Sequence, residues 1–325
     1  MRISLIIPVY NAETSLPDML RSLSAQLFCD FDVVFVDDGS RDRTPEILRD
    51  FAADSRIPCR IIRQENRGVA AARNQGLAAA TGDYVGFVDA DDRMEPDALE
   101  KAVGVLLAKD NPIDIVGWDW TLGFEKNGRY MRQADYDTPL QALKNLMGGT
   151  MRWNLWLFLV RRDLLVRHDI RFIDGADMGE DMQFMIKAYC AANHVAQLHA
   201  PLYRYNAVSE TSLSRQFSDA RRAEIETNLD EATAAVTASP FAGSLAPYIQ
   251  YLKLYLKLPL LISSDRSNYE LWYRWWSEAN TAAMANKALP LRTRLLQRAA
   301  AHRHWLVIRL YHCLIYRVVY GILYR

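Results

Sequence analysis

The sequence has few cysteines and no long uncharged apolar run. Its 325 residues include only four cysteines, which form no CxxC pair and have no spacing typical of a zinc site. We therefore expect free thiols in a reducing compartment. No stretch of about 18 uncharged apolar residues occurs, which argues against a membrane-spanning helix. The apolar segment after Met1 is too short for a signal peptide and is typical of a β-strand.

The sequence also lacks an excess of either charge. Lys+Arg and Asp+Glu each number 39, so the total charge indicates no nucleic-acid partner and none is expected. The distribution is nevertheless uneven. No Asp or Glu follows Glu278, whereas eight Lys or Arg residues do, so the C-terminal end is basic. Half of the residues are hydrophobic, which is enough for a sizeable core.

Short apolar runs alternate with helical patterns over the first 120 residues. Thr44 is expected to cap one of the helices, because Pro45 suits the first helical position. The alternation predicts an α/β fold with a mostly parallel sheet flanked by helices. Five strands are expected in this part, at 5–9, 31–36, 60–64, 84–88 and 113–118.

The pattern loosens after about residue 120. An apolar run at 153–160 precedes a helical pattern at 181–192, and two short strands are expected at 195–198 and 202–205. Only helical patterns occur beyond residue 215. We therefore predict an α/β domain at 1–215 and a helical C-terminal region at 216–325.

Polar residues gather where the predicted strands end. Ligands of parallel α/β sheets bind beyond the carboxyl ends of the strands, so these residues are candidates for a binding site. They are Tyr10-Asn11, Asp37-Asp38, Asn66 and Asp89-Ala90-Asp91-Asp92.

The acidic cluster carries the most chemistry. In an extended segment, Asp89 and Asp91 point to the same side, where two carboxylates repel unless a cation lies between them. Mg²⁺ and Mn²⁺ favour such oxygens and share their remaining positions with substrate phosphates. The alternative is a solvated loop that caps the helix beginning near Pro96, a role that suits Asp92.

Five motifs in order resemble inverting glycosyltransferases of family 2, which have the GT-A fold. The resemblance spans roughly residues 3–215. Each motif is weak alone, whereas five in order at matching spacings are specific. They are Pro8-Val9-Tyr10-Asn11, Val36-Asp37-Asp38-Gly39-Ser40, Asn66-Arg67-Gly68 with Ala72-Arg73-Asn74-Gln75-Gly76, Asp89-Ala90-Asp91-Asp92, and Gly179-Glu180-Asp181.

The resemblance implies a site for a nucleotide sugar, most simply a UDP-sugar. Asp38 would hydrogen-bond the base, since a carboxylate suits an N–H donor such as that of uracil. Arg73 would close the base pocket; the alternative is an exposed helix arginine. The residues that the resemblance places on the base or on the adjacent loop are Pro8, Val9, Tyr10, Asn66 and Gly68.

The resemblance also divides the acidic residues by role. Asp89, with Ala90 beside it, would contact the ribose and support the metal, and Asp91 would ligate Mn²⁺ or Mg²⁺ directly. Asp181 would be the general base, with Glu180 orienting the acceptor. A helix start should keep a carboxylate there ionised. The alternative is that these two acids only cap the helix.

Three later residues have weaker signals. The family often has a lysine after Trp-Asn, whereas here Asn154 is followed by leucine. Trp153 would stack on a sugar or lie in the core. Arg204 suits phosphate, in a segment with 212–214 that resembles one folding over the diphosphate. His199 is interpreted as a strand-packing residue rather than a ligand.

The segment 305–324 is rich in aliphatic and aromatic residues, interrupted by arginines. On a helix, those arginines occupy about half of the circumference and apolar residues the other half. This pattern predicts a helix lying in a membrane interface, with arginines toward anionic headgroups. The alternatives are packing against the α/β domain or against a second subunit in a homo-oligomer.

Taken with the resemblance, these observations predict metal-dependent, inverting transfer of a sugar to a glycan or lipid-linked glycan hydroxyl. Bacterial surface polysaccharide synthesis is the implied setting, on the cytoplasmic face of the inner membrane. One alternative is a sugar-1-phosphate nucleotidyltransferase, but the segment after Tyr10 lacks its Gly-rich, basic phosphate loop. Another is a non-catalytic glycan- or membrane-binding protein, against which the intact acidic motifs argue.

Overall fold

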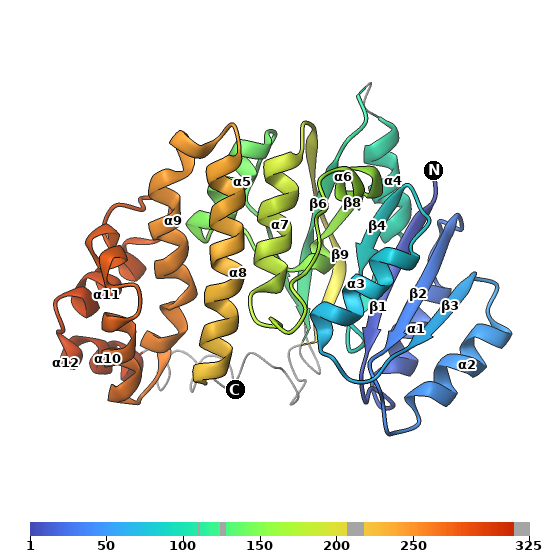
Figure 1. The fold of residues 1–325 in the computed structure, drawn as a ribbon, viewed down its shortest axis with the longest axis horizontal. Helices are drawn as coiled ribbons and strands as arrows, with labels where there is room; N and C mark the ends of the chain where they lie inside the picture. The colour runs from blue at the N-terminus through green and yellow to red at the C-terminus, as the bar shows by residue number, and fades with distance from the viewer. Residues whose placement is uncertain (109–110, 124–127, 207–217, 315–325) are drawn as a thin grey trace. The chain divides into compact units, whose positions relative to one another are not determined.

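The computed structural model describes residues 1–108, 111–123, 128–206 and 218–314 (Figure 1). The chain divides into two compact units. The first comprises residues 1–142 and 152–239, and the second comprises residues 143–151 and those from Pro240 onward. The predicted boundary near residue 215 lies outside the described residues and stays a prediction.

The first part of the chain alternates strands and helices as expected, with bounds within about two residues of most predictions. Thr44 is an exception in detail. It begins its helix, but its hydroxyl accepts a hydrogen bond from the Ala12 N–H at 2.8 Å and does not cap the helix. The elements are β1 (Ile3–Val9), α1 (Leu16–Ser24), β2 (Phe31–Asp37), α2 (Thr44–Asp54), β3 (Cys59–Arg63), α3 (Val69–Ala79), β4 (Tyr84–Phe87), β5 (Arg93–Met94), α4 (Ala98–Leu107) and β6 (Ile115–Gly123).

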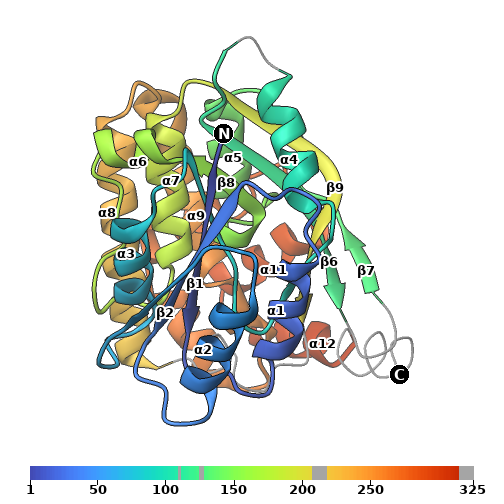
Figure 2. The same ribbon diagram turned by 90° about the vertical axis from the view of Figure 1, so that its right-hand side faces the viewer.

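The following part completes the sheet. The two short strands expected after residue 195 form one continuous strand, β9, which runs beside β6 (Figure 2). α7 and α8 pack side by side. The elements are β7 (Gly128–Met131), α5 (Pro139–Gly148), the 3₁₀ turn η1 (Leu155–Leu157), β8 (Phe158–Arg161), α6 (Arg162–Arg167), α7 (Glu180–Ala191), β9 (Val195–Asn206) and α8 (Asp219–Ala238).

The sheet has the order β3-β2-β1-β4-β8-β6-β9-β5, and β7 pairs with β6. The prediction of parallel strands holds for β3-β2-β1-β4, whereas the other half is mixed because β8 runs antiparallel to both β4 and β6. Parallel strands covered on both faces are apolar throughout, and β1 and β2 are buried almost along their length. Their carboxyl ends therefore meet at one edge of the sheet.

The second unit is helical, as predicted, and no helix in the described ranges is long and apolar enough to cross a bilayer. Its interior holds one lysine. The ammonium of Lys257 donates to the Trp275 and Trp276 carbonyls and to Asn280 Oδ1, and it lies 4.3 Å from the centre of the Trp272 ring. The elements are α9 (Ala242–Leu256), η3 (Leu258–Ile262), α10 (Arg266–Arg274), η4 (Ser277–Ala282), α11 (Leu291–Ala301) and α12 (Trp305–Cys313).

Candidate active site

Hydrogen bonds join the ends of β1 and β2. The Asn11 N–H donates to Ser40 Oγ at 3.0 Å, and Asn11 Oδ1 accepts from the Arg41 N–H at 2.9 Å. Tyr10, just before this turn, has half of its side chain exposed and is available to a ligand. Val9, expected on the base, is only 1% exposed because it is the last inward residue of β1. Of the predicted pair before Tyr10, only Pro8 is partly accessible.

Asp38 is buried and holds the loop after β3. Its Oδ1 accepts from Gln64 Nε2 at 2.7 Å and from the Arg67 N–H at 2.9 Å, and its Oδ2 accepts from the Gly68 N–H at 2.9 Å. An ionised carboxylate has about four acceptor positions, so one is left for a base N–H. The predicted base contact stays a prediction, and these three hydrogen bonds give Asp38 a loop-shaping role as well.

Gly68 is required where α3 begins. Its φ is +90°, and a Cβ there would lie 2.0 Å from Asp177 Oδ2. The neighbouring Asn66 is exposed at the rim of this loop. The sequence therefore identified a glycine whose backbone conformation and surroundings both exclude a side chain.

Asp174 and Asp177 also belong to this region, and sequence reasoning missed them. Asp177 Oδ1 accepts from the Ala70 N–H at 2.9 Å, at the start of α3. Asp174 accepts from Arg67 Nη2 at 2.7 Å and from Asn74 Nδ2 at 2.8 Å. These bonds tie the segment before α7 to α3. The available signal was the pair of acids shortly before the Glu-Asp motif.

Arg73 lies at the centre of the site. Its Nη1 contacts Glu180 Oε1 at 2.7 Å and Asp181 Oδ1 at 3.0 Å, and its Nη2 lies 3.4 Å from Asp89 Oδ1. Its side chain is 5% exposed, so the alternative of an exposed helix arginine is wrong. Burial would lower the pKa of Arg73, but the three carboxylates hold it above its ordinary value. These contacts give Arg73 carboxylate neighbours rather than contacts with the base loop.

The two acids at the start of α7 have different surroundings. Burial raises the pKa of Glu180 to about 8, and the adjacent Asp181 adds to the rise, whereas Arg73 opposes it. At Glu180, desolvation therefore opposes the effect of the helix start, which favours the ionised carboxylate; the expectation for the proposed base stays a prediction. Asp181 is held on both oxygens, by Arg73 and by the Leu155 N–H, which donates to Oδ2 at 3.3 Å. Neither acid makes a side-chain capping bond with α7.

The segment 89–92 forms a turn rather than the extended backbone that was expected, with the Asp92 N–H donating to the Asp89 carbonyl at 3.2 Å. Asp92 does not cap α4. It is buried, and its Oδ1 accepts from the Asn206 N–H at the end of β9 at 2.7 Å. Burial, together with Asp89 and Asp91, raises the pKa of Asp92 well above its ordinary value.

Asp89 is anchored on its backbone, because its N–H donates to the hydroxyl of buried Tyr203 at 3.1 Å. Burial raises the pKa of Asp89 to about 6; Arg73 opposes this rise, and Asp181 and Asp91 add to it. Asp91 is half-buried, and in the described part of the chain no donor contacts its carboxylate. The two carboxylates therefore lie near each other with acceptor positions open.

These residues fit a divalent cation that is shared with a ligand. Around Arg73 the carboxylates outnumber the single buried cation, which favours an additional positive charge. In the ranges that the structure describes, no three Asp, Glu, His or Cys side chains are grouped so that they alone could hold an ion. Mg²⁺ and Mn²⁺ are commonly held by one or two carboxylates, with phosphate oxygens and water completing the shell. Asp91 and Asp89 suit that arrangement.

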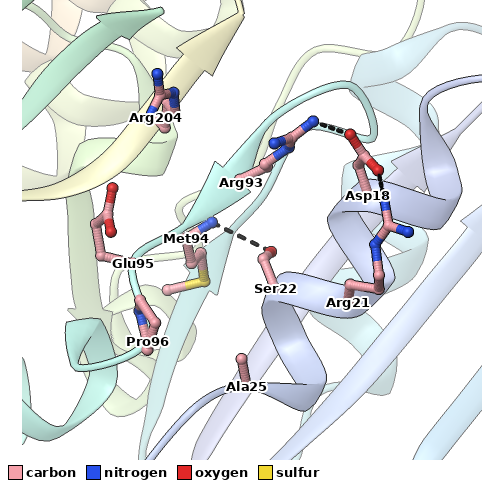
Figure 3. A pocket seen from close by; sticks show the side chains of 9 residues that line it. All are labelled: Asp18, Arg21, Ser22, Ala25, Arg93, Met94, Glu95, Pro96 and Arg204. Carbon is pink, nitrogen blue, oxygen red and sulfur yellow. Dashed lines mark hydrogen bonds and ion pairs between the residues drawn. The ribbon is translucent and has the colours of Figure 1, made fainter. Parts of the chain in front are cut away.

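Arg204 and His199 are not brought to this cluster. Side chains alternate along β9, so Tyr203 points to Asp89 and Arg204 points to the opposite face. There Arg204 lines a pocket of about 310 Å³ (Figure 3). Arg21 and Arg93, which both contact Asp18, line another part of the same pocket. The predicted diphosphate contact of Arg204 has no support in this geometry.

His199 is held between two carboxylates. Its Nδ1 lies 2.9 Å from Asp119 Oδ2 and its Nε2 lies 2.5 Å from Asp135 Oδ1. This agrees with a structural role for His199. Trp153 is half-buried, and the tryptophan that enters the core is Trp156, whose ring stacks on Tyr203 at 4.4 Å.

The family follows from comparison with known proteins. The model of glycosyl transferase family 2 matches residues 4–176, more than half of the chain, and the chain belongs to this family. EpsH of Bacillus subtilis (strain 168), which is named as a glycosyltransferase, is 34% identical over 211 residues. That match covers 62% of this chain and 60% of EpsH, so it spans less than two thirds of that relative.

Two solved structures share the fold. TarS of S. aureus, whose crystal structure of residues 1–349 contains UDP-GlcNAc, has a TM-score of 0.73 at 21% identity, covering 95% of this chain and 91% of that one. The mannosyltransferase PcManGT from Pyrobaculum calidifontis, solved with GDP-Man and Mn²⁺, has a TM-score of 0.56 at 21% identity, covering 96% and 84%. These likenesses confirm the GT-A fold that the motifs predicted.

Proposed function

We propose that this protein transfers a sugar, with inversion, from a nucleotide-diphosphate donor to a hydroxyl of a glycan or lipid-linked glycan. The observation that carries the proposal is the cluster around Arg73, which joins the predicted metal-side acid Asp89 to the predicted base Asp181. A displacement of this kind needs a base that takes the proton of the acceptor hydroxyl. It also needs a positive charge that stabilises the negative charge on the leaving diphosphate.

In the proposed reaction the acceptor oxygen bonds to the anomeric carbon as the bond from that carbon to the diphosphate oxygen breaks. Asp181 takes the hydroxyl proton, and the Arg73 and Leu155 contacts hold its carboxylate in place for that transfer. Burial raises the pKa of Glu180, and its Oε1 already accepts from Arg73 at 2.7 Å, so Glu180 is proposed to orient the acceptor rather than to act as the base. A divalent ion held by Asp91 and Asp89 would neutralise charge on the diphosphate.

A UDP-sugar is the proposed donor and Mn²⁺ or Mg²⁺ the proposed metal. Support comes from the open carboxylate positions of Asp89 and Asp91, from the UDP-GlcNAc in the TarS structure and from the Mn²⁺ in that of PcManGT. The proposed setting is surface polysaccharide synthesis, with the protein peripheral to the cytoplasmic face of a membrane. The relative TarS is named as a poly(ribitol-phosphate) β-N-acetylglucosaminyltransferase, so the acceptor in its name is a polymer that carries hydroxyl groups.

A binding and turnover experiment tests the proposal. Unfolding temperatures are measured with UDP-, GDP- and other nucleotide sugars, with and without Mn²⁺, and slow donor hydrolysis is followed by release of the nucleoside diphosphate. We expect one donor to stabilise the protein in a metal-dependent way. Asp181→Asn should abolish transfer while donor binding stays nearly unchanged. The absence of stabilisation by any diphosphate nucleotide, or wild-type turnover by Asp181→Asn, would contradict it.

A further inference from the structure

Helices α11 and α12 present an exposed apolar surface, here called the α11–α12 face. Of thirteen exposed large hydrophobic side chains in the described ranges, six lie within the 24 residues of this segment. A concentration of this kind is uncommon on the surface of a monomer and marks an interaction site. The six are Leu291, Leu295, Leu306, Val307, Leu310 and Leu314.

Three of these side chains form one stripe on α12. Leu306, Leu310 and Leu314 are four residues apart and lie on the same side of the helix, with exposed fractions of 71%, 61% and 59%. Ile308 projects from the other side and is fully buried against the second unit. The helix is therefore fixed to its unit by Ile308, while its leucine side has no covering in the described structure.

Three of the four arginines named here on or between α11 and α12 have no matching acid in the described structure. Arg303 is paired with Glu270, which also accepts from Trp305 Nε1. Arg292, Arg298 and Arg309 are exposed, and no carboxylate pairs with them among the residues placed in the structure. Since no Asp or Glu follows Glu278, the segment itself cannot supply counter-charges.

We infer that the α11–α12 face binds the surface of an anionic lipid bilayer. A leucine stripe flanked by arginines suits burial of the apolar side chains at the acyl boundary with the guanidinium groups among phosphates. A symmetric pair of copies fits less well, because an isologous contact would bring the unmatched arginines of both copies together without carboxylates between them. The sequence pattern predicted that the apolar half of this helix, opposite the arginines, would face the membrane. In the structure Ile308 is buried against the second unit, and the leucine stripe that faces outward lies on the same side as Arg309.

The surface stands on this geometry alone, and its purpose rests on the proposed function. An acceptor carried on a lipid lies at a membrane, and docking would hold the enzyme near it. This gives the inference a separate test from turnover, because vesicle binding and donor hydrolysis can fail independently.

The experiment is co-sedimentation of the full chain with two kinds of vesicle, phosphatidylcholine alone and phosphatidylcholine mixed with an equal amount of phosphatidylglycerol. Binding is expected only to the mixed vesicles and should weaken with salt. Leu306→Ser/Leu310→Ser should lose it. The matched control is Leu27→Ser/Leu107→Ser, which replaces two equally exposed leucines of the first unit and should bind as the wild type does.

Charge is tested in the same assay. Arg292→Gln/Arg309→Gln should weaken binding about twenty-five-fold, since each basic side chain near an anionic surface contributes about fivefold. The control, Arg49→Gln/Arg56→Gln, removes two exposed arginines elsewhere and should change little.

Two outcomes overturn the inference. One is that the wild type does not bind the mixed vesicles, or that the serine variant binds them equally well. The other is a wild-type dimer that dissociates in the serine variant without any vesicle binding, which would assign the face to a second copy. Donor hydrolysis is measured throughout and should be unchanged in all four variants. Vesicle binding without hydrolysis of any nucleotide sugar would refute the proposed function and leave the lipid surface standing.

Discussion

Replacing Arg73 by methionine removes the one buried cation of the site while keeping a similar volume. Three carboxyl groups then lose their partner at 2.7, 3.0 and 3.4 Å. Breaking a buried ion pair from one side costs about 3–5 kcal/mol. Because burial raises the pKa of Glu180 and so reduces the negative charge that loses its partner, we expect the lower end, about 3 kcal/mol. For a chain of this size the unfolding temperature should fall by about 4–5 °C.

Activity should fall further than stability alone explains. Arg73 is one of two groups that hold the Asp181 carboxylate, and a displacement of about 1 Å in a reacting group costs about 100-fold in rate. We therefore expect kcat to fall about 100-fold at a temperature where the variant is fully folded, with a smaller change in KM for the donor. The assay is release of the nucleoside diphosphate, alongside thermal unfolding.

Two further variants separate charge from geometry. Arg73→Lys restores the charge but cannot span three carboxylates as a planar guanidinium does, so stability should recover more than kcat. Arg67→Met removes a half-exposed ion pair with Asp174 and should cost at most about 1 kcal/mol. If Arg73→Met unfolds at the wild-type temperature and keeps kcat within about twofold, Arg73 neither stabilises the site nor positions Asp181.

Three other changes have defined outcomes. Asp91→Asn should abolish the rise in unfolding temperature that Mn²⁺ causes. Without metal or donor, the free energy of unfolding should stay within about 0.5 kcal/mol of the wild type, since no described side chain contacts that carboxylate. If Mn²⁺ stabilises the variant as much as the wild type, Asp91 is not a metal ligand. Gly68→Ala should destabilise the protein by more than Gly175→Ala, because both glycines have positive φ but only at Gly68 would a Cβ lie against another side chain. Equal losses in the free energy of unfolding, measured by chemical denaturation, would refute the contact. Burial lowers the pKa of Lys257 from 10.5 to about 7, so the unfolded chain binds more protons between those values and this group makes stability rise with pH there. Lys257→Met should flatten that rise in denaturation measured from pH 7 to 10, and an identical pH slope would contradict the assignment.

The sequence alone determined the local elements and the place of the site. Strand periods depend on neighbouring residues, so the bounds of β1 to β4 could be predicted within about two residues. Polar residues at strand ends also marked the site, because parallel strands end at one edge. The motif order was sufficient to predict the family, which the comparisons confirm.

Only the tertiary structure decided what the predicted residues contact. Arg73 contacts Glu180, 107 positions away, and Asp92 contacts Asn206, 114 positions away. The tertiary fold brings the start of α7 to α3 and the end of β9 to the turn after β4, with β8 antiparallel between β4 and β6. No local period encodes that strand order. Burial, likewise, is a property of the whole fold. It raises the pKa of Glu180 and leaves the leucine side of α12 facing outward, while the placement of β9 in the sheet turns Arg204 away from the acids.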